Sequence, residues 1–153
     1  MKVTDLMIGD LILINNTPHR VQAIDSIDAE IQADDELYYV GEDRCHSEDK
    51  IEGIPVTPEI LEKNGFNPET FLTAEWGRKV YFKEFPGCVV EPANSGKYIF
   101  GTTKYWSETY GDGSPKDWGT MYESRIYNLQ YVHELQRALR CCGLWDVADN
   151  FVV

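Results

Sequence analysis

The residues with the clearest capacity for chemistry lie in "YVHELQRALRCCG", residues 131–143. His133 and the glutamate after it begin the H-E-x-x-H pattern, in which two imidazoles one helical turn apart bind zinc. The position four residues after His133 is Arg137, whose positive charge would repel a metal ion. The other histidines, His19 and His46, lie in unrelated segments. The spacing therefore argues against a zinc protease, and we predict no metal site and no cofactor.

Three polar side chains of this segment fall on one ridge of the expected helix, at i, i+3 and i+7: His133, Gln136 and Arg140. At 100° per residue Gln136 lies inside the apolar arc, and a buried amide needs hydrogen-bond partners. We interpret the ridge as a polar seam that ties the helix to a sheet edge or to backbone carbonyl groups, with His133 as a hydrogen-bonding strut. The alternative is that the ridge lines a small polar binding pocket.

Aromatic side chains give a second candidate binding site. Trp106 and Trp118, with other aromatic residues of the same region, are suited to a stacking platform for a sugar or a peptide, and the alternative is that they belong to the core. The loop "YGDGSPKDWG", residues 110–119, lacks the Lys-Ser/Thr ending of a phosphate-binding loop. The sequence contains no G-x-S-x-G nucleophile motif. We therefore assign no catalytic residue.

Charge narrows the classes of partner. The chain of 153 residues has a net charge of −12, and residues 25–53 hold eleven carboxylates against two cations, a balance of −9. Such a field repels nucleic-acid phosphates and anionic lipid, so we expect a protein partner and no direct binding to nucleic acid or membrane. Loose calcium binding by Asp34, Asp35 and Glu36 is a further alternative, although the spacing of an EF-hand is missing.

The compartment follows from the absence of targeting signals. No apolar run approaches the roughly 18 to 20 residues that span a bilayer. The first 16 residues, "MKVTDLMIGDLILINN", are interrupted by Asp5 and Asp10 and do not resemble a signal peptide. The four cysteines form no C-x-x-C pair, which favours reduced thiols. We therefore expect a cytoplasmic protein.

The first 52 residues predict a small acidic lobe. Short apolar runs separated by turn residues predict strands at 11–14, 20–24, 27–31 and 37–40. So many short strands in so few residues indicate a strongly bent, SH3-like β-barrel, with the acidic side chains on its outer faces.

Residues 53–153 predict an α+β lobe that shares a core with the first. Thr57 as N-cap, Pro58 at N1 and Asn64-Gly65 as a stop predict a short helix over about 58–64. Aromatic and β-branched runs over about 71–127 predict an antiparallel meander of three or four strands. An amphipathic helix over about 128–142 is expected to pack on that meander.

Three segments carry a resemblance to a family: "LMIGDLILI" (6–14), "GIPVTPEILEKNGF" (53–66) and "YVHELQRAL" (131–139). In this order they resemble uncharacterised phage and prophage proteins of gut anaerobes, which have an L-x-x-G-N/D segment, an I-P-L-T-x-E-I-L-x-x-N-G-F helix and a terminal Y-V/L-H-Q-L-Q-N helix. The chain departs from the last motif at Glu134 and Arg137, where the family commonly has Gln and Asn. The resemblance implies a mobile element in a bacterial cytoplasm and no mechanism.

These observations favour a non-enzymatic phage or prophage accessory protein that binds other proteins. One alternative is an acidic DNA mimic that inhibits a host DNA-processing protein, which requires carboxylates spaced like backbone phosphates. Another is a small hydrolase-like enzyme that uses His133 as an acid or base, with neighbouring arginines lowering the pKa of that imidazole.

Overall fold

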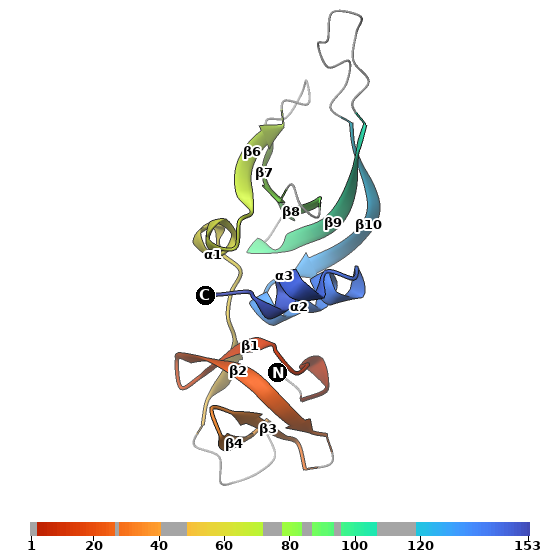
Figure 1. Ribbon diagram of the computed structural model, residues 1–153. Coiled ribbons are helices and arrows are strands. Elements are labelled where there is room, and N and C mark those ends of the chain that lie inside the picture. The colour runs from red at the N-terminus through yellow and green to blue at the C-terminus, as the bar shows by residue number, and fades with distance from the viewer. Residues whose placement is uncertain are drawn as a thin grey trace, which may run out of the picture. The chain divides into compact units, whose positions relative to one another are not determined.

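A computed structural model of the chain describes residues 3–26, 28–40, 49–71, 78–83, 87–93, 96–106 and 119–153. The fold is α+β, with two antiparallel sheets and short helices (Figure 1). The chain forms two compact units. Unit 1 comprises residues 1–56 and 131–151 with Val153, and unit 2 comprises residues 57–130 with Val152.

Unit 1 contains a five-stranded antiparallel sheet in the order β4-β3-β2-β1-β5. Its strands are β1 (Leu11–Ile14), β2 (Thr17–Asp25), β3 (Glu30–Ala33), β4 (Glu36–Tyr39) and β5 (Ile51–Gly53), and a short 3₁₀ helix, η1 (Val3–Asp5), precedes them. Two-residue turns join β1 to β2 and β3 to β4. Their central residues, Asn15, Asn16, Asp34 and Asp35, all have positive φ, which Asn and Asp tolerate best among non-glycine residues.

The sheet of unit 1 bends along β2. The pairing of β2 with β3 shifts register between Val21 and Ala23, and such a bulge increases the local twist of a strand. One buried cluster collects side chains from across the bent sheet: Leu6, Ile12, Ile14, Val21, Ile31, Ala33 and Val40. The apolar run of β1 also buries Leu11, whose side chain alternates to the face opposite Ile12. β1 is therefore covered on both of its faces.

Two helices complete unit 1. They are α2 (Val132–Cys141) and α3 (Trp145–Asp149), and α2 lies beside β1 and contacts α3 (Figure 1). Gly143, with φ of +78°, allows the chain to turn sharply after α2. Within the described part of the chain, no helix is both long and apolar enough to cross a membrane.

Unit 2 contains an antiparallel meander in the order β10-β9-β8-β7-β6. The strands are β6 (Asn67–Phe71), β7 (Arg78–Lys83), β8 (Cys88–Pro92), β9 (Tyr98–Trp106) and β10 (Gly119–Leu129). The meander has five strands where three or four were expected, because residues 67–71 and 88–92 also pair.

The short helix of unit 2, α1 (Pro58–Lys63), begins and ends as predicted. The Thr57 hydroxyl accepts a hydrogen bond from the Ile60 N–H at 3.3 Å, and Gly65 adopts φ of +78° after the last turn. Lys83 of β7 donates to the Asn64 carbonyl at 2.8 Å, at the end of the helix where a cation is favoured. These contacts fix α1 on the meander.

Three sequence predictions differ from the fold. The first sheet is strongly bent, but no closed barrel is found among the described residues. The terminal helix was expected to belong with the meander, but it is part of unit 1, where it packs on β1 and Gln136 binds the backbone at the start of that strand. It also begins at Val132 rather than near residue 128, since β10 continues to Leu129. The expected lobe over 53–153 is thus divided between the two units.

Candidate functional site

The start of α2 is fixed by the segment that follows β5. The Val132 N–H donates to the Ile54 carbonyl at 2.8 Å, and Tyr131 forms an isolated antiparallel bridge with Pro55. The Glu134 carboxylate accepts from the Tyr131 N–H at 3.0 Å, which satisfies a donor at the positive end of the helix. The polar ridge on the next turns of α2 is therefore held at a defined position beside β1.

Gln136 is fully buried, and its amide is fully bonded. Its Oε1 accepts from the Leu11 N–H at 2.8 Å, and its Nε2 donates to the carbonyls of Gly9 at 3.1 Å and Ala148 at 2.8 Å. One side chain thus links α2, α3 and the first residue of β1. For Gln136, these bonds agree with the predicted attachment of the ridge to backbone carbonyls, although β1 is an interior strand and not a sheet edge.

Arg140 joins two carboxylates that are distant in sequence. Its Nη1 donates to Asp10 Oδ1 at 2.5 Å, and its Nε and Nη2 donate to Asp149 Oδ1 at 3.1 and 3.0 Å. The Asp10 side chain is completely buried, and its second oxygen accepts from the Met7 N–H at 2.8 Å. Burial raises the pKa of Asp10 above the usual 3.8, while the hydrogen bonds from Arg140 and Met7 oppose that rise.

Arg20 and Gly9 connect this network to the C-terminal segment. Arg20 donates to the Gly9 carbonyl at 2.6 Å and to the Phe151 carbonyl at 2.7 Å. Gly9 has φ of +89°, and a Cβ atom there would lie 2.8 Å from Arg140 Nη2. The positive φ favours glycine at this position, and a Cβ atom would displace the Arg140 guanidinium group.

His133 does not act as the predicted hydrogen-bonding strut. Its side chain is 4 % exposed, and its Nδ1 has no hydrogen-bond partner among the described residues. The ring stacks on Tyr131, with centroids 5.6 Å apart and planes 8° apart. Gly53 makes room for this stack, because a Cβ atom there would lie 2.5 Å from Tyr131 Cγ. Burial lowers the pKa of His133, with the charge of Arg137 adding to that effect and nearby carboxylates opposing it.

Asp10, Arg140 and Asp149 are thus linked by side-chain hydrogen bonds, and Gln136 beside them is bonded to backbone. Each N–H of the Gln136 amide is used by backbone, and the Arg140 side chain is directed at two carboxylates. Sequence reasoning missed Asp10 as a partner because Gly9-Asp10 matches a common turn pair. The arrangement joins α2 to α3 and to the backbone at the start of β1. Asp10, Gln136 and Arg140 are buried, whereas the Asp149 side chain is 54 % exposed.

The other sequence candidates were the tryptophans of the predicted stacking platform and the carboxylates of the possible calcium site. Trp106 ends β9 in unit 2, and Trp118 lies outside the described residues. Asp34 and Asp35 form the β3–β4 turn, and Asp34 Oδ2 is 2.7 Å from His19 Nδ1. Among the residues that the structure describes, no group of three or more His, Cys, Asp or Glu side chains is placed to hold a metal ion.

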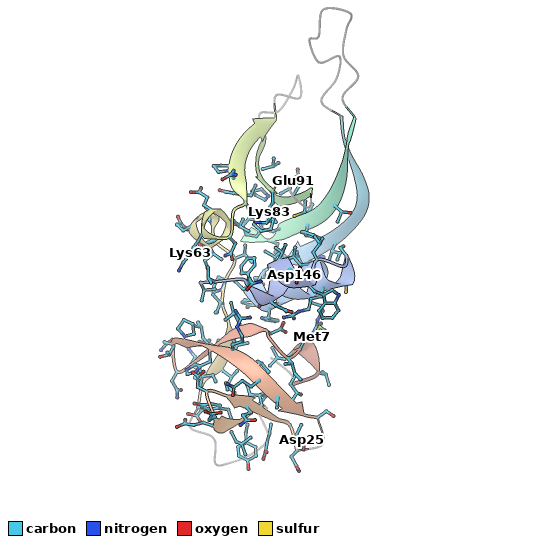
Figure 2. All side chains as sticks on the ribbon, viewed as in Figure 1. Met7, Asp25, Lys63, Lys83, Glu91 and Asp146 are labelled. Atoms are coloured by element: carbon cyan, nitrogen blue, oxygen red, sulfur yellow. The ribbon has the colours of Figure 1, made fainter. Side chains whose placement is uncertain are left out.

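The outer strand of unit 1, β4, exposes large apolar side chains. Leu37 is 66 % exposed and Tyr39 is 40 % exposed, and their spacing of two places both on one face of the strand. β4 ends the sheet order, so no strand among the described residues pairs with its outer edge. In Figure 2, Met7, which precedes β1, lies near the helices of unit 1, whereas Asp25, at the end of β2, lies farther from them. In the strand order, β2 and β3 separate β4 from β1, on which α2 packs. The β4 surface is therefore separate from the buried network.

Comparisons with models of known protein families, with characterised proteins and with solved structures found no match to this chain. Function must therefore be argued from the two regions of unit 1 just described.

Proposed function

We propose that this protein is a non-enzymatic protein-binding module, that unit 1 is an open SH3-like barrel braced by α2 and α3, and that β4 is its binding surface. A phage or prophage setting in a bacterial cytoplasm is part of the proposal and rests on the sequence resemblance alone.

The SH3-like assignment is supported by the strand order and the bend. Five short antiparallel strands follow one another in the sheet, with β5 returning to pair with β1. The bulge in β2 bends the sheet around one apolar cluster, as in small barrels that close only in part. The brace consists of α2, which packs on β1, and α3, which packs on α2.

One observation carries the binding role: the exposure of Leu37 and Tyr39 on a terminal strand. Exposed edges that carry large apolar side chains invite pairing with another chain, so proteins usually shorten or charge them. Here the edge keeps two apolar side chains within a segment of net charge −9. An apolar contact surface within an acidic surround suits a protein that carries positive charge.

The enzyme alternative is less well supported by the geometry. A general acid or base must reach the proton that it transfers, and His133 is buried at 4 % exposure against Tyr131. The DNA-mimic alternative shares the acidic surface with our proposal, but it does not require the apolar side chains of β4. The experiment below separates these functions.

The test is affinity capture from a bacterial lysate with the whole protein and two matched variants. Leu37→Lys changes the β4 surface, while Ile8→Lys introduces the same charge at a side chain that is 63 % exposed in the turn before β1. We expect the wild type and Ile8→Lys to retain the same proteins and Leu37→Lys to lose them. Retained proteins should leave the resin as salt rises, because surface charge contacts are screened.

Equal recovery by all three proteins would contradict the role of β4. Captured DNA-processing enzymes that are released by added duplex DNA, with Leu37→Lys as effective as wild type, would instead support the DNA mimic. Variants are compared only after thermal unfolding shows that each is folded.

A further inference from the structure

We infer that the outer edge of β4 receives an extended segment of a partner, with alternating apolar and basic side chains, as a sixth strand of the unit 1 sheet. This inference rests on the proposed function, because it names the kind of partner that the same surface binds.

The register of β3 and β4 leaves backbone groups directed at this edge. The two-residue turn makes Ala33 and Glu36 the first hydrogen-bonded pair, and pairs of this kind alternate along an antiparallel ladder. The Val40 N–H bonds to the Ala29 carbonyl at 2.8 Å, which agrees with that alternation. Leu37 therefore directs its N–H and C=O away from β3, where an added strand would bind them.

The side chains of β4 favour a partner strand in which apolar and basic residues alternate. Leu37 and Tyr39 project to one face, where their neighbours across β3 are Gln32 and Glu30. Glu36 projects to the other face, where it accepts a hydrogen bond from the Tyr38 hydroxyl at 2.8 Å. An added strand would contact Leu37 and Tyr39 with every second side chain, and the intervening side chains would lie near Glu36. Apolar and basic residues at these alternate positions match the surface.

The negative charge around β4 determines which extended segments can bind at its edge. Residues 25–40, which form the end of β2 with β3 and β4, contain six carboxylates and no lysine or arginine. A second copy of this chain would bring the same charges to the edge, and like charges opposite one another oppose pairing. A lysine-rich or arginine-rich segment gains attraction from the same residues. The partner is thus basic, and self-association through this edge is disfavoured at neutral pH.

The experiment titrates the whole protein with fluorescent ten-residue peptides and follows their anisotropy. The first peptide alternates valine and lysine, the second alternates valine and glutamate, and the third is the valine–lysine peptide with N-methyl groups along one edge. We expect the first to bind, the second to show no binding, and the third to bind at least about tenfold more weakly because main-chain hydrogen bonds are lost. Amide chemical shifts should change most at residues 36–40.

Two protein variants sharpen the test. Leu37→Pro removes the outward N–H without removing a bond to β3, and should weaken binding of the first peptide by about tenfold. Equal binding of the methylated and unmethylated peptides would overturn strand addition. If the two peptides bound equally and Leu37→Lys abolished the binding of both, strand addition would be wrong. The proposed role of β4 as a binding surface would still stand. The protein alone could also form dimers that the first peptide does not dissociate. That result would identify a second copy of the chain as the occupant of the β4 edge and would overturn the inference of a basic partner. The methylated peptide keeps the test valid if Leu37→Pro does not fold.

Discussion

Two regions of unit 1, the polar residues beside α2 and the apolar residues on β4, differ from the usual pattern in which polar side chains are exposed and apolar side chains are buried. Beside α2, the polar residues Asp10, Gln136 and Arg140 are buried, whereas on β4 the apolar residues Leu37 and Tyr39 are exposed. The buried polar residues are bonded to one another and to backbone, so their burial is explained by the fold alone. The exposed apolar residues leave much of their surface open to solvent, and we propose that a partner covers it.

The comparison separates stability from function. A buried charge that loses its partner is strongly destabilising, while an exposed side chain contributes little to folding. Substitutions in the network beside α2 should therefore change the free energy of unfolding, and substitutions on β4 should change binding. The expected effects on unfolding decrease from Arg140 to Leu37.

Arg140→Met should produce the largest loss. The methionine leaves the Asp10 carboxylate buried without its cation, which typically costs about 3–5 kcal/mol. Urea unfolding at pH 7, followed by tryptophan fluorescence and circular dichroism, measures the change. Adding Asp10→Asn to this variant should recover part of the loss, because the amide has no charge and still accepts from the Met7 N–H.

Arg137→Met is the matched control for that substitution. Arg137 lies three residues earlier on α2, is partly exposed, and donates to the Asp5 carbonyl. Its loss should cost less than about 1 kcal/mol, as for other exposed polar contacts. Equal losses for the two arginine variants would mean that the buried pair does not stabilise unit 1.

Gln136→Leu should give the next largest effect. The leucine has a similar volume but leaves the Leu11 N–H and the Ala148 carbonyl buried without the amide, at a cost of about 2–3 kcal/mol. Gln22→Leu is the control, because Gln22 is exposed on β2 and its amide accepts from the Asp35 N–H. If both variants unfolded at the same urea concentration as the wild type, the seam would have no structural role.

Local signals in the sequence were sufficient for some of these elements. The helix over 58–64 was predicted closely because its N-cap, N1 proline and Asn-Gly stop act within a few residues. The first two strands and the strand at 37–40 were predicted because turn residues separate them. Gln136 was singled out correctly, since an amide within an apolar arc signals a buried polar contact.

Long-range pairing could not be predicted from the same signals. An amphipathic stripe shows that α2 has a buried face, but it does not show which sheet covers it. The partners of Gln136 and Arg140 at Gly9, Asp10 and Leu11 lie 125 to 130 residues earlier in the chain, in and after a turn with no distinctive pattern. Leu129 fits both the helical arc and the end of a strand, so the start of α2 was misplaced. The expected role of His133 was wrong because its neighbours on the same ridge make the bonds.

His133 should give unit 1 a measurable dependence on pH. Burial holds the pKa of this imidazole below 6.5, so the unfolded chain binds a proton more readily than the folded chain. The stability that depends on a neutral His133 is therefore complete above pH 6.5. It decreases as the pH falls below 6.5, by at most about 1.4 kcal/mol per pH unit.

His133→Phe isolates that contribution. Phenylalanine keeps a ring against Tyr131, and Nδ1 has no bond to lose among the described residues. As the pH falls from 7 to 5, the unfolding free energy of the wild type should decrease more than that of the variant. Parallel pH profiles for the two proteins would show that His133 does not titrate differently on folding.

Leu37→Ser completes the comparison with the smallest expected effect on stability. The side chain is 66 % exposed, so its replacement should change the free energy of unfolding by no more than about 0.5 kcal/mol. The same substitution should remove apolar contact area from the β4 surface and weaken binding of the valine–lysine peptide. A Leu37→Ser protein that unfolds much more easily than the wild type would show that Leu37 packs within unit 1. Its exposure would then no longer argue for a partner, whereas a stable variant with weakened binding would assign this side chain to recognition.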